Sequence, residues 1–307
     1  MEQRATASWP ALLRDIRAHV VKQIARGISL VENEAVGYED LLLSLPPNTT
    51  TKIIGITGPP GAGKSTLVDA LIGVIAGSGL RVCVLCVDPS SPFNMGALLG
   101  DRIRMSDWYN HPNVFIRSLA TRGSLGGLHP RIIEITELMK AAAFDFIIVE
   151  TVGVGQSEIE IAGLADVTVV VVVPEAGDEV QTMKAGLMEI ADIFVVNKAD
   201  RPDADQFVKN LRLMLAPAFR NHTQEVPVIK TVASRQEGVE PLYEAIRQQL
   251  LLHHDDTRKA WLLAERAYYL VQQRRMKDIR KDLLQQDILL QLKDNQFNLY
   301  RFVRSLY

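Results

Sequence analysis

Hydrophobic positions along the chain follow two spacings, short continuous runs and repeats of three or four residues. Continuous runs rich in valine and isoleucine are typical of strands buried on both faces of a sheet, and the repeats between them indicate amphipathic helices. The predicted strands are 52–57, 81–88, 145–151, 167–173, 192–197 and 226–233. The predicted helices between or after them are 64–77, 130–144, 179–191, 204–215 and 239–253.

The two ends of the chain have a different pattern. Residues 9–45 repeat apolar positions at helical spacing, and Pro46 and Pro47 interrupt the repeat. Beyond Pro241 the chain contains neither glycine nor proline, and this tail predicts two or three further helices. We therefore expect an N-terminal helical segment (1–48), an α/β domain with a mostly parallel sheet between helices (49–254), and a C-terminal helical arm (255–307).

A glycine-rich stretch, GPPGAGKST, joins the first predicted strand to the first helix of the α/β domain. It matches G-x-x-x-x-G-K-[ST], in which glycines let consecutive backbone N–H groups face phosphates at a helix N-terminus. The lysine reaches the β- and γ-phosphates and the serine hydroxyl binds Mg²⁺. This pattern predicts a P-loop NTPase fold. The residues expected at the nucleotide are Gly58, Pro59, Pro60, Gly61, Ala62, Gly63, Lys64, Ser65 and Thr66.

Three acidic residues are candidates for the magnesium site. Asp88 and Glu150 end predicted strands, and Asp101 follows in a loop. Carboxylates at the C-terminal ends of parallel strands point into the crevice where ligands bind, and Mg²⁺ prefers oxygen ligands. The stretch ETVGVGQ occupies the place of Asp-x-x-Gly in many GTPases, so Glu150 is expected to hold the metal through a water. Gly153 is then expected to donate its N–H to the γ-phosphate.

The sequence NKAD, from Asn197 to Asp200, predicts which base is bound. A carboxylate accepts two hydrogen bonds, and guanine presents N1–H and its 2-amino group side by side, whereas adenine offers no such pair. Asn197 and Lys198 are expected to brace the loop and the ring. Ala233 and Ser234 follow the last predicted strand and take the place of the last guanine-contacting loop. These residues favour GTP over ATP.

Composition narrows the possible partners. The formal net charge is -2, which gives no reason to expect nucleic acid or an anionic membrane as a partner. The two cysteines, Cys83 and Cys86, lie inside an apolar strand, so we expect packing and not redox or zinc chemistry. No disulfide framework, signal segment or membrane-length apolar run is present in the sequence. We therefore expect a cytoplasmic location.

Several longer stretches resemble one family, the MeaB/ArgK GTPases that serve as chaperones of methylmalonyl-CoA mutase and its relatives. The stretches are GPPGAGKST, VDPSSP, GDRIRM, RGSLGG, VETVGVGQSE and GDEVQTMKAGLMEIADIFVVNKAD. Of these, VDPSSP and ETVGVGQSE are not general GTPase motifs. The resemblance runs from about residue 30 to 200 and continues more loosely through the tail.

The resemblance implies a homodimeric GTPase that gates adenosylcobalamin delivery to an acyl-CoA mutase and helps to eject damaged cofactor. Cobalamin would then be bound by the partner enzyme, and the mutase's adenosyltransferase is a second candidate partner. The resemblance carries Asp88, Asp101 and Glu150 over as magnesium-site acids and places the dimerisation arm in the helical tail. Switch segments fall on 90–105 and 150–158, and a third falls on 175–186, with Asp178 and Lys184 at its charged positions.

Two functional hypotheses concern residues of these switch segments. Gln156 could orient the attacking water, but it lies three residues beyond Gly153, and the role of a γ-phosphate sensor or an interface residue is favoured. No sequence feature assigns an arginine finger, so slow intrinsic turnover is expected until a partner completes the site. Lys184 is hypothesised to respond to that partner. An unchanged mutase-stimulated rate in Lys184→Ala would contradict this role.

Two other classes of protein share parts of this pattern. A nickel-insertion GTPase belongs to the same branch of P-loop proteins, but it would need Cys or His ligands near a switch or at the N-terminus. A transport-associated ATPase or kinase for basic amino acids matches an older description of the family, but NKAD argues against ATP. The sequence therefore favours the mutase chaperone.

Overall fold

The computed structural model describes residues 9–47, 50–88, 105–121, 128–152, 157–176, 185–215, 226–252, 256–293 and 297–306. It divides into two compact units, Met1–Lys259 and Ala260–Tyr307. Within the described part of the chain, no helix combines the length and the apolar character needed to cross a membrane. The first unit carries the sheet and the predicted nucleotide site.

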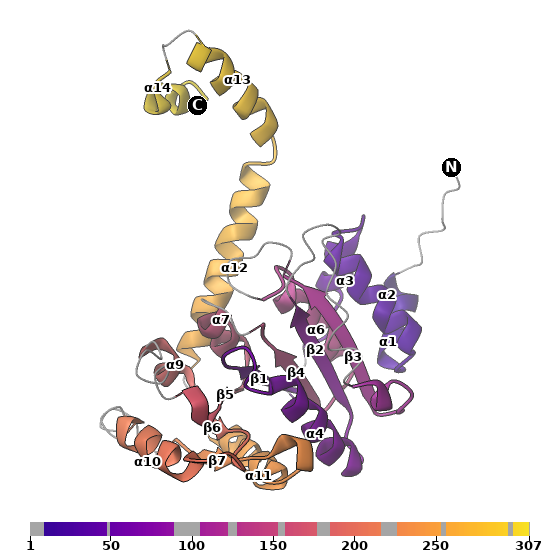
Figure 1. Cartoon of the computed structure of the whole chain (residues 1–307). Helices are drawn as coiled ribbons and strands as arrows, with labels where there is room; N and C mark the ends of the chain where they lie inside the picture. Colours follow the sequence, from indigo (N-terminus) through magenta and orange to yellow (C-terminus); the bar gives the residue numbers. More distant parts are fainter. Residues whose placement is uncertain are drawn as a thin grey trace. The chain divides into compact units, whose positions relative to one another are not determined.

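The first unit is built on a seven-stranded sheet in the order β3-β2-β4-β1-β5-β6-β7, with parallel pairing throughout (Figure 1). This confirms the predicted α/β fold with a sheet between helices. The strands are β1 (Lys52–Thr57), β2 (Val82–Asp88), β3 (Val114–Ala120), β4 (Phe146–Glu150), β5 (Val167–Val172), β6 (Ile193–Val196) and β7 (Val228–Lys230).

Helices cover both faces of the sheet, as continuous apolar strands require. One face packs on α4 (Lys64–Gly77) and α11 (Val239–Leu251), and the other packs on α10 (Ala204–Leu215). Alternate strand residues serve the two faces: Val169 belongs to the first core and Val170 to the second. Other helices of this unit are α6 (Ile132–Ala141), α7 (Ser157–Leu164) and α9 (Ala185–Ile190).

Two elements were not expected from the pattern, strand β3 and helix α7. The polar side chains of Arg117 and Ser118 interrupt the apolar run of β3. In the structure Arg117 donates to Glu32 Oε2 at 2.8 Å and to Ser29 Oγ at 3.3 Å. Both partners belong to α2, so long-range pairing compensates the charged position, Arg117, that helps to hide the strand in the sequence.

The N-terminal helices belong to the first unit. They are α1 (Trp9–Arg17), α2 (Val21–Glu32) and α3 (Tyr38–Leu43), and each of them contacts α6. Ile16, Ile28 and Leu41 are fully buried, which shows that these helices share a core with the rest of the unit.

Three aspartates fix the amino-terminal edge of the sheet. Each aspartate lies just before a strand and forms two hydrogen bonds with one residue in or next to a neighbouring strand. The backbone N–H of the aspartate donates to the C=O of that residue, and the N–H of that residue donates to the aspartate Oδ2 at 2.7 Å. The pairs are Asp145 with Arg81, Asp166 with Ile53, and Asp192 with Thr168. The repeated carboxylate therefore sets strand register at the edge opposite the predicted site.

Replacing Asp166 with alanine is expected to destabilise the first unit. The N–H of the buried Ile53 would lose its acceptor, and a buried unsatisfied donor costs about 1–3 kcal/mol. Thermal and urea unfolding would measure the loss. Asp166→Asn keeps a carbonyl oxygen at the same place and should lose less. Equal stability of Asp166→Ala and the native chain would show that this contact does not contribute.

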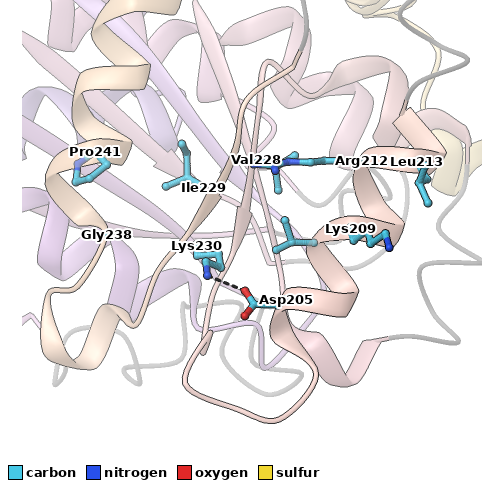
Figure 2. Close-up of a pocket in the computed structure, with 10 residues that line it drawn as sticks. Asp205, Lys209, Arg212, Leu213, Val228, Ile229, Lys230, Gly238 and Pro241 are labelled. Atoms are coloured by element: carbon cyan, nitrogen blue, oxygen red, sulfur yellow. Dashed lines mark hydrogen bonds and ion pairs between the residues drawn. The ribbon is translucent and has the colours of Figure 1, made fainter.

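A cavity of about 620 Å³ lies beside the edge strand β7, between α10 and the start of α11 (Figure 2). Its walls include the apolar Val208 and Val228, and Lys230 is paired with Asp205 at 2.7 Å. A three-residue edge strand carrying a lysine is a common protection against pairing with another chain. None of the residues that line the cavity is a predicted site residue.

The second unit consists of helical segments. Helix α12 (Thr257–Arg275) runs into it, and α13 (Lys281–Lys293) and α14 (Leu299–Arg304) lie within it. Asn298 accepts a hydrogen bond from the N–H of Arg301 at 3.1 Å and so caps α14. Large apolar side chains of this unit are exposed, among them Tyr268, Leu290 and Tyr300.

Candidate nucleotide site

The glycine-rich stretch forms a loop between β1 and α4, at the carboxyl edge of the sheet. Two of its glycines are required by close neighbours. Gly58 has φ +141°, and a Cβ there would lie 2.0 Å from the carbonyl oxygen of Val171. Gly63 has φ +86°, and a Cβ there would lie 2.4 Å from Nδ2 of Asn197. Side chains at these positions would push the loop away from β5 and from Asn197.

Lys64 begins α4 and is buried, with 6% of its surface exposed. Its ammonium donates to the carbonyl oxygens of Gly58 at 2.9 Å and Pro59 at 3.1 Å. The charge therefore lies over the loop whose N–H groups and helix N-terminus favour an anion.

Two buried carboxylates end neighbouring strands at this edge of the sheet, and one of them contacts a hydroxyl at the end of the loop. Glu150 ends β4 and Asp88 ends the adjacent strand β2. Ser65 Oγ donates to Glu150 Oε1 at 2.7 Å, and all three residues are less than 8% exposed. This all-oxygen donor set fits Mg²⁺, which favours hard ligands and retains waters. Among the described residues, no group of three or more His, Cys, Asp or Glu side chains is placed to hold a metal ion.

A threonine pair that the sequence analysis did not identify lies beside this set. Thr151 Oγ1 donates to Thr57 Oγ1 at 2.9 Å, and the Thr151 N–H donates to the carbonyl of Ile56 at 3.0 Å. Both threonines are buried. The pair ties the residue that follows Glu150 to the end of β1, and thereby fixes where the ETVGVGQ stretch leaves the sheet. Two threonines 94 positions apart carry no signal in the sequence.

Asn197 connects three parts of the site. It is 2% exposed, and its Nδ2 donates to the carbonyl of Ala62 in the P-loop at 2.9 Å. Its Oδ1 accepts from Thr231 Oγ1 at 3.1 Å and from the N–H of Ala233 at 3.2 Å. The amide therefore joins the P-loop, the end of β6 and the loop after β7 into one structure.

Lys198 and Asp200 continue from Asn197 toward solvent. Lys198 has φ +55°, and its ammonium donates to the carbonyl of Gly61 at 2.7 Å. Asp200 is partly exposed, and its Oδ2 accepts from Arg235 Nη2 at 3.1 Å. Arg235 ends the 3₁₀ turn that also contains Ala233 and Ser234. Ala233 and Ser234 were predicted at the base site from the sequence, whereas Arg235 was not.

Other predicted functional residues lie outside the described ranges. They are Asp101, Gly153, Gln156, Asp178 and Lys184. The described geometry thus brings together the P-loop, the pair Asp88 and Glu150, and the NKAD loop.

Comparison of the chain with known families and proteins identifies one protein family. The family model described as "Methylmalonyl Co-A mutase-associated GTPase MeaB" matches residues 24–293. A relative from Pyrococcus abyssi is 51% identical over 228 residues, which make up 73% of this chain and 70% of the relative. The GTPase ArgK of Escherichia coli is 37% identical over 244 residues, 76% of this chain and 73% of that protein.

A solved structure supports the same relationship over the full length. The crystal structure described as an LAO/AO transport system kinase matches with a TM-score of 0.67 and 26% identity. The match covers 100% of this chain and 98% of that one.

Proposed function

The chain belongs to the MeaB family of methylmalonyl-CoA mutase-associated GTPases, and we propose that it is a GTP-hydrolysing chaperone of a cobalamin-dependent acyl-CoA mutase. As a member of this family it is a GTPase that converts GTP to GDP and phosphate. In the proposed role, GTP hydrolysis gates the loading of adenosylcobalamin into the mutase and assists removal of damaged cofactor. Cobalamin and acyl-CoA are ligands of the partner enzyme, and the adenosyltransferase that supplies the cofactor is a second candidate partner.

The proposed phosphate site consists of residues 58–66. Lys64 is placed over the loop by its contacts with Gly58 and Pro59, and we assign it to the β- and γ-phosphates. The backbone N–H groups of the loop and the N-terminus of α4 add positive potential there. This environment stabilises the charge that develops on the phosphoryl oxygens during transfer.

We assign the magnesium site to Ser65, Asp88 and Glu150, together with Asp101. The first three residues are buried oxygen donors at the ends of neighbouring elements. Mg²⁺ bound there would neutralise charge on the phosphates. Ser65 would ligate through its hydroxyl, which already lies 2.7 Å from Glu150, while Glu150 would hold a water of the ion.

We assign base recognition to Asp200, whose carboxylate would accept the N1–H and 2-amino hydrogens of guanine. The contacts of Asn197 support a bracing role, because its amide bonds to Ala62, Thr231 and Ala233. Lys198 would brace the ring from the P-loop side. Ala233 and Ser234 would close the base site.

The proposed gate depends on a slow intrinsic reaction that a partner accelerates. Gly153 is assigned to the γ-phosphate and Lys184 to the response to the mutase. The switch segments 150–158 and 175–186 would therefore respond to the bound nucleotide and to the partner, respectively. γ-Phosphate contacts that order a loop are an established way to convert hydrolysis into conformational change. We further propose a cytoplasmic homodimer, which the exposed apolar side chains of α12 and α13 support.

GTP hydrolysis is expected to rise when a cobalamin-dependent acyl-CoA mutase from the same organism is added. Phosphate release from purified protein with GTP, alone and with the mutase, tests this, and a cobalamin-independent enzyme serves as the protein control. ATP should not be turned over, because adenine leaves the Asp200 carboxylate without its donors.

A slow GTPase activity that no cobalamin mutase changes would remove the chaperone assignment and leave the nucleotide site in place. The metal-insertion class would then be tested next. Turnover of ATP at the rate of GTP would instead contradict the base assignment and favour the transport-associated ATPase or kinase.

A further inference from the structure

Arg235 contacts the carboxylate to which we assign guanine recognition. Its Nη2 lies 3.1 Å from Asp200 Oδ2, and the side chains are 59% and 35% exposed. The two residues are 35 positions apart and come from the loops that follow β7 and β6. An arginine at this point is not demanded by the packing of the core.

The turn that carries Arg235 is closed by backbone hydrogen bonds. Val232 and Glu237 exchange N–H···O bonds of 3.0 and 3.3 Å, and the Arg235 N–H donates to the carbonyl of Val232 at 2.9 Å. Gly238, with φ +76°, follows this turn and packs so closely against β7 that a Cβ would lie 2.1 Å from the carbonyl oxygen of Lys230. The backbone of Arg235 therefore has a defined position relative to β7.

The same turn is bonded to the NKAD loop. The N–H of Ala233 donates to Asn197 Oδ1 at 3.2 Å, and the N–H of Ala199 donates to the carbonyl of Thr231 at 3.0 Å. A guanidinium that extends from this turn to Asp200 adds a side-chain link between loops already joined through their backbones. This link restricts the orientation of the Asp200 carboxylate.

We propose that Arg235 is a positioning residue that holds the Asp200 carboxylate in the orientation that reads guanine. An ionised carboxylate has about four lone-pair sites on its two oxygens, and guanine needs one on each oxygen. Arg235 occupies one site, on Oδ2, through a single nitrogen. The ion pair and the base contacts are therefore compatible. The ion pair also restricts the rotamers of Asp200 before the base binds, which lowers the entropy cost of binding. This inference rests on the proposed guanine recognition.

An exposed ion pair can also be without consequence, so the test needs a matched arginine. Arg247 on α11 is 60% exposed and lies 3.6 Å from Glu244. Arg247→Ala removes the same charge at a similarly exposed position away from the NKAD loop. Titration calorimetry with GDP and with IDP, which lacks the 2-amino group, would be carried out on the full chain with Mg²⁺.

Arg235→Ala is expected to weaken GDP binding by about threefold to fivefold, in the range of a favourable exposed ion pair. IDP binding should fall less, because IDP does not use the carboxylate contact to the 2-amino group. Arg247→Ala should stay within about twofold for both nucleotides. Arg235→Lys should lie between Arg235→Ala and the native chain, since it keeps the charge without the planar fork.

A further comparison separates this inference from the assignment on which it rests. In an Asp200→Asn background, Arg235→Ala should change GDP affinity by less than about twofold, because coupled residues are not additive. Equal losses for GDP and IDP, or equal effects of Arg235→Ala and Arg247→Ala, would overturn the role of Arg235. An unaltered GDP preference in Asp200→Asn alone would overturn the guanine assignment itself.

Discussion

Replacing Asp200 with asparagine is expected to shift base preference from guanine toward xanthine. Guanine presents two donors to the carboxylate, whereas an amide offers one acceptor and one donor group. The 2-amino group would then face an N–H₂ group, and both would be left without an acceptor. Xanthine has a carbonyl at that position, which the amide can satisfy.

The expected loss of GDP affinity is about 10²-fold or more, since sites built to bond a substrate group reject mismatched analogues by up to roughly 10⁴–10⁵. Binding of GDP and XDP to the two proteins would be measured by calorimetry. Asp203→Asn is the matched control, because Asp203 is an exposed acid three positions further on and the charge change is the same. Tight GDP binding by Asp200→Asn, with no gain for XDP, would refute the assignment.

The second large effect is expected for Lys64→Ala, in which GTP hydrolysis should fall by about 10²–10³-fold, as on loss of one preorganised transition-state donor. In the structure the ammonium bonds to Gly58 and Pro59 and so stabilises the loop. In the proposed site it would also place a buried positive charge beside the phosphates.

Single-turnover hydrolysis at saturating GTP measures the chemical step, and GDP titration measures binding separately. Lys209→Ala removes an exposed lysine from α10 and should change neither quantity by more than about twofold. Thermal unfolding would establish that Lys64→Ala remains folded. Hydrolysis within about tenfold of the native rate in a folded Lys64→Ala protein would contradict the assigned role of this lysine.

Local sequence rules predicted most of the fold. Apolar runs rich in valine and isoleucine predicted six of the seven strands, and of these only the short edge strand β7 is not buried along most of its length. Strand β3 was missed because Arg117 and Ser118 interrupt its apolar run. The partners of the Arg117 guanidinium lie on α2, which comes much earlier in the chain. The aspartates that precede β4, β5 and β6 were also missed, since their acceptor role exists only once strand order is set.

The sequence by itself determined the P-loop, the guanine motif, the strand-end carboxylates and the family, because each is a short stretch whose chemistry depends on its own residue types and spacing. Tertiary structure alone decided which of these side chains meet. Ser65 reaches Glu150 across 85 positions and Asn197 reaches Ala62 across 135. The roles of Arg235 and of the Thr57–Thr151 pair can be recognised only from such long-range contacts. Hydrogen bonds act over about 3 Å, so partners distant in sequence are set by strand order, which no local pattern specifies.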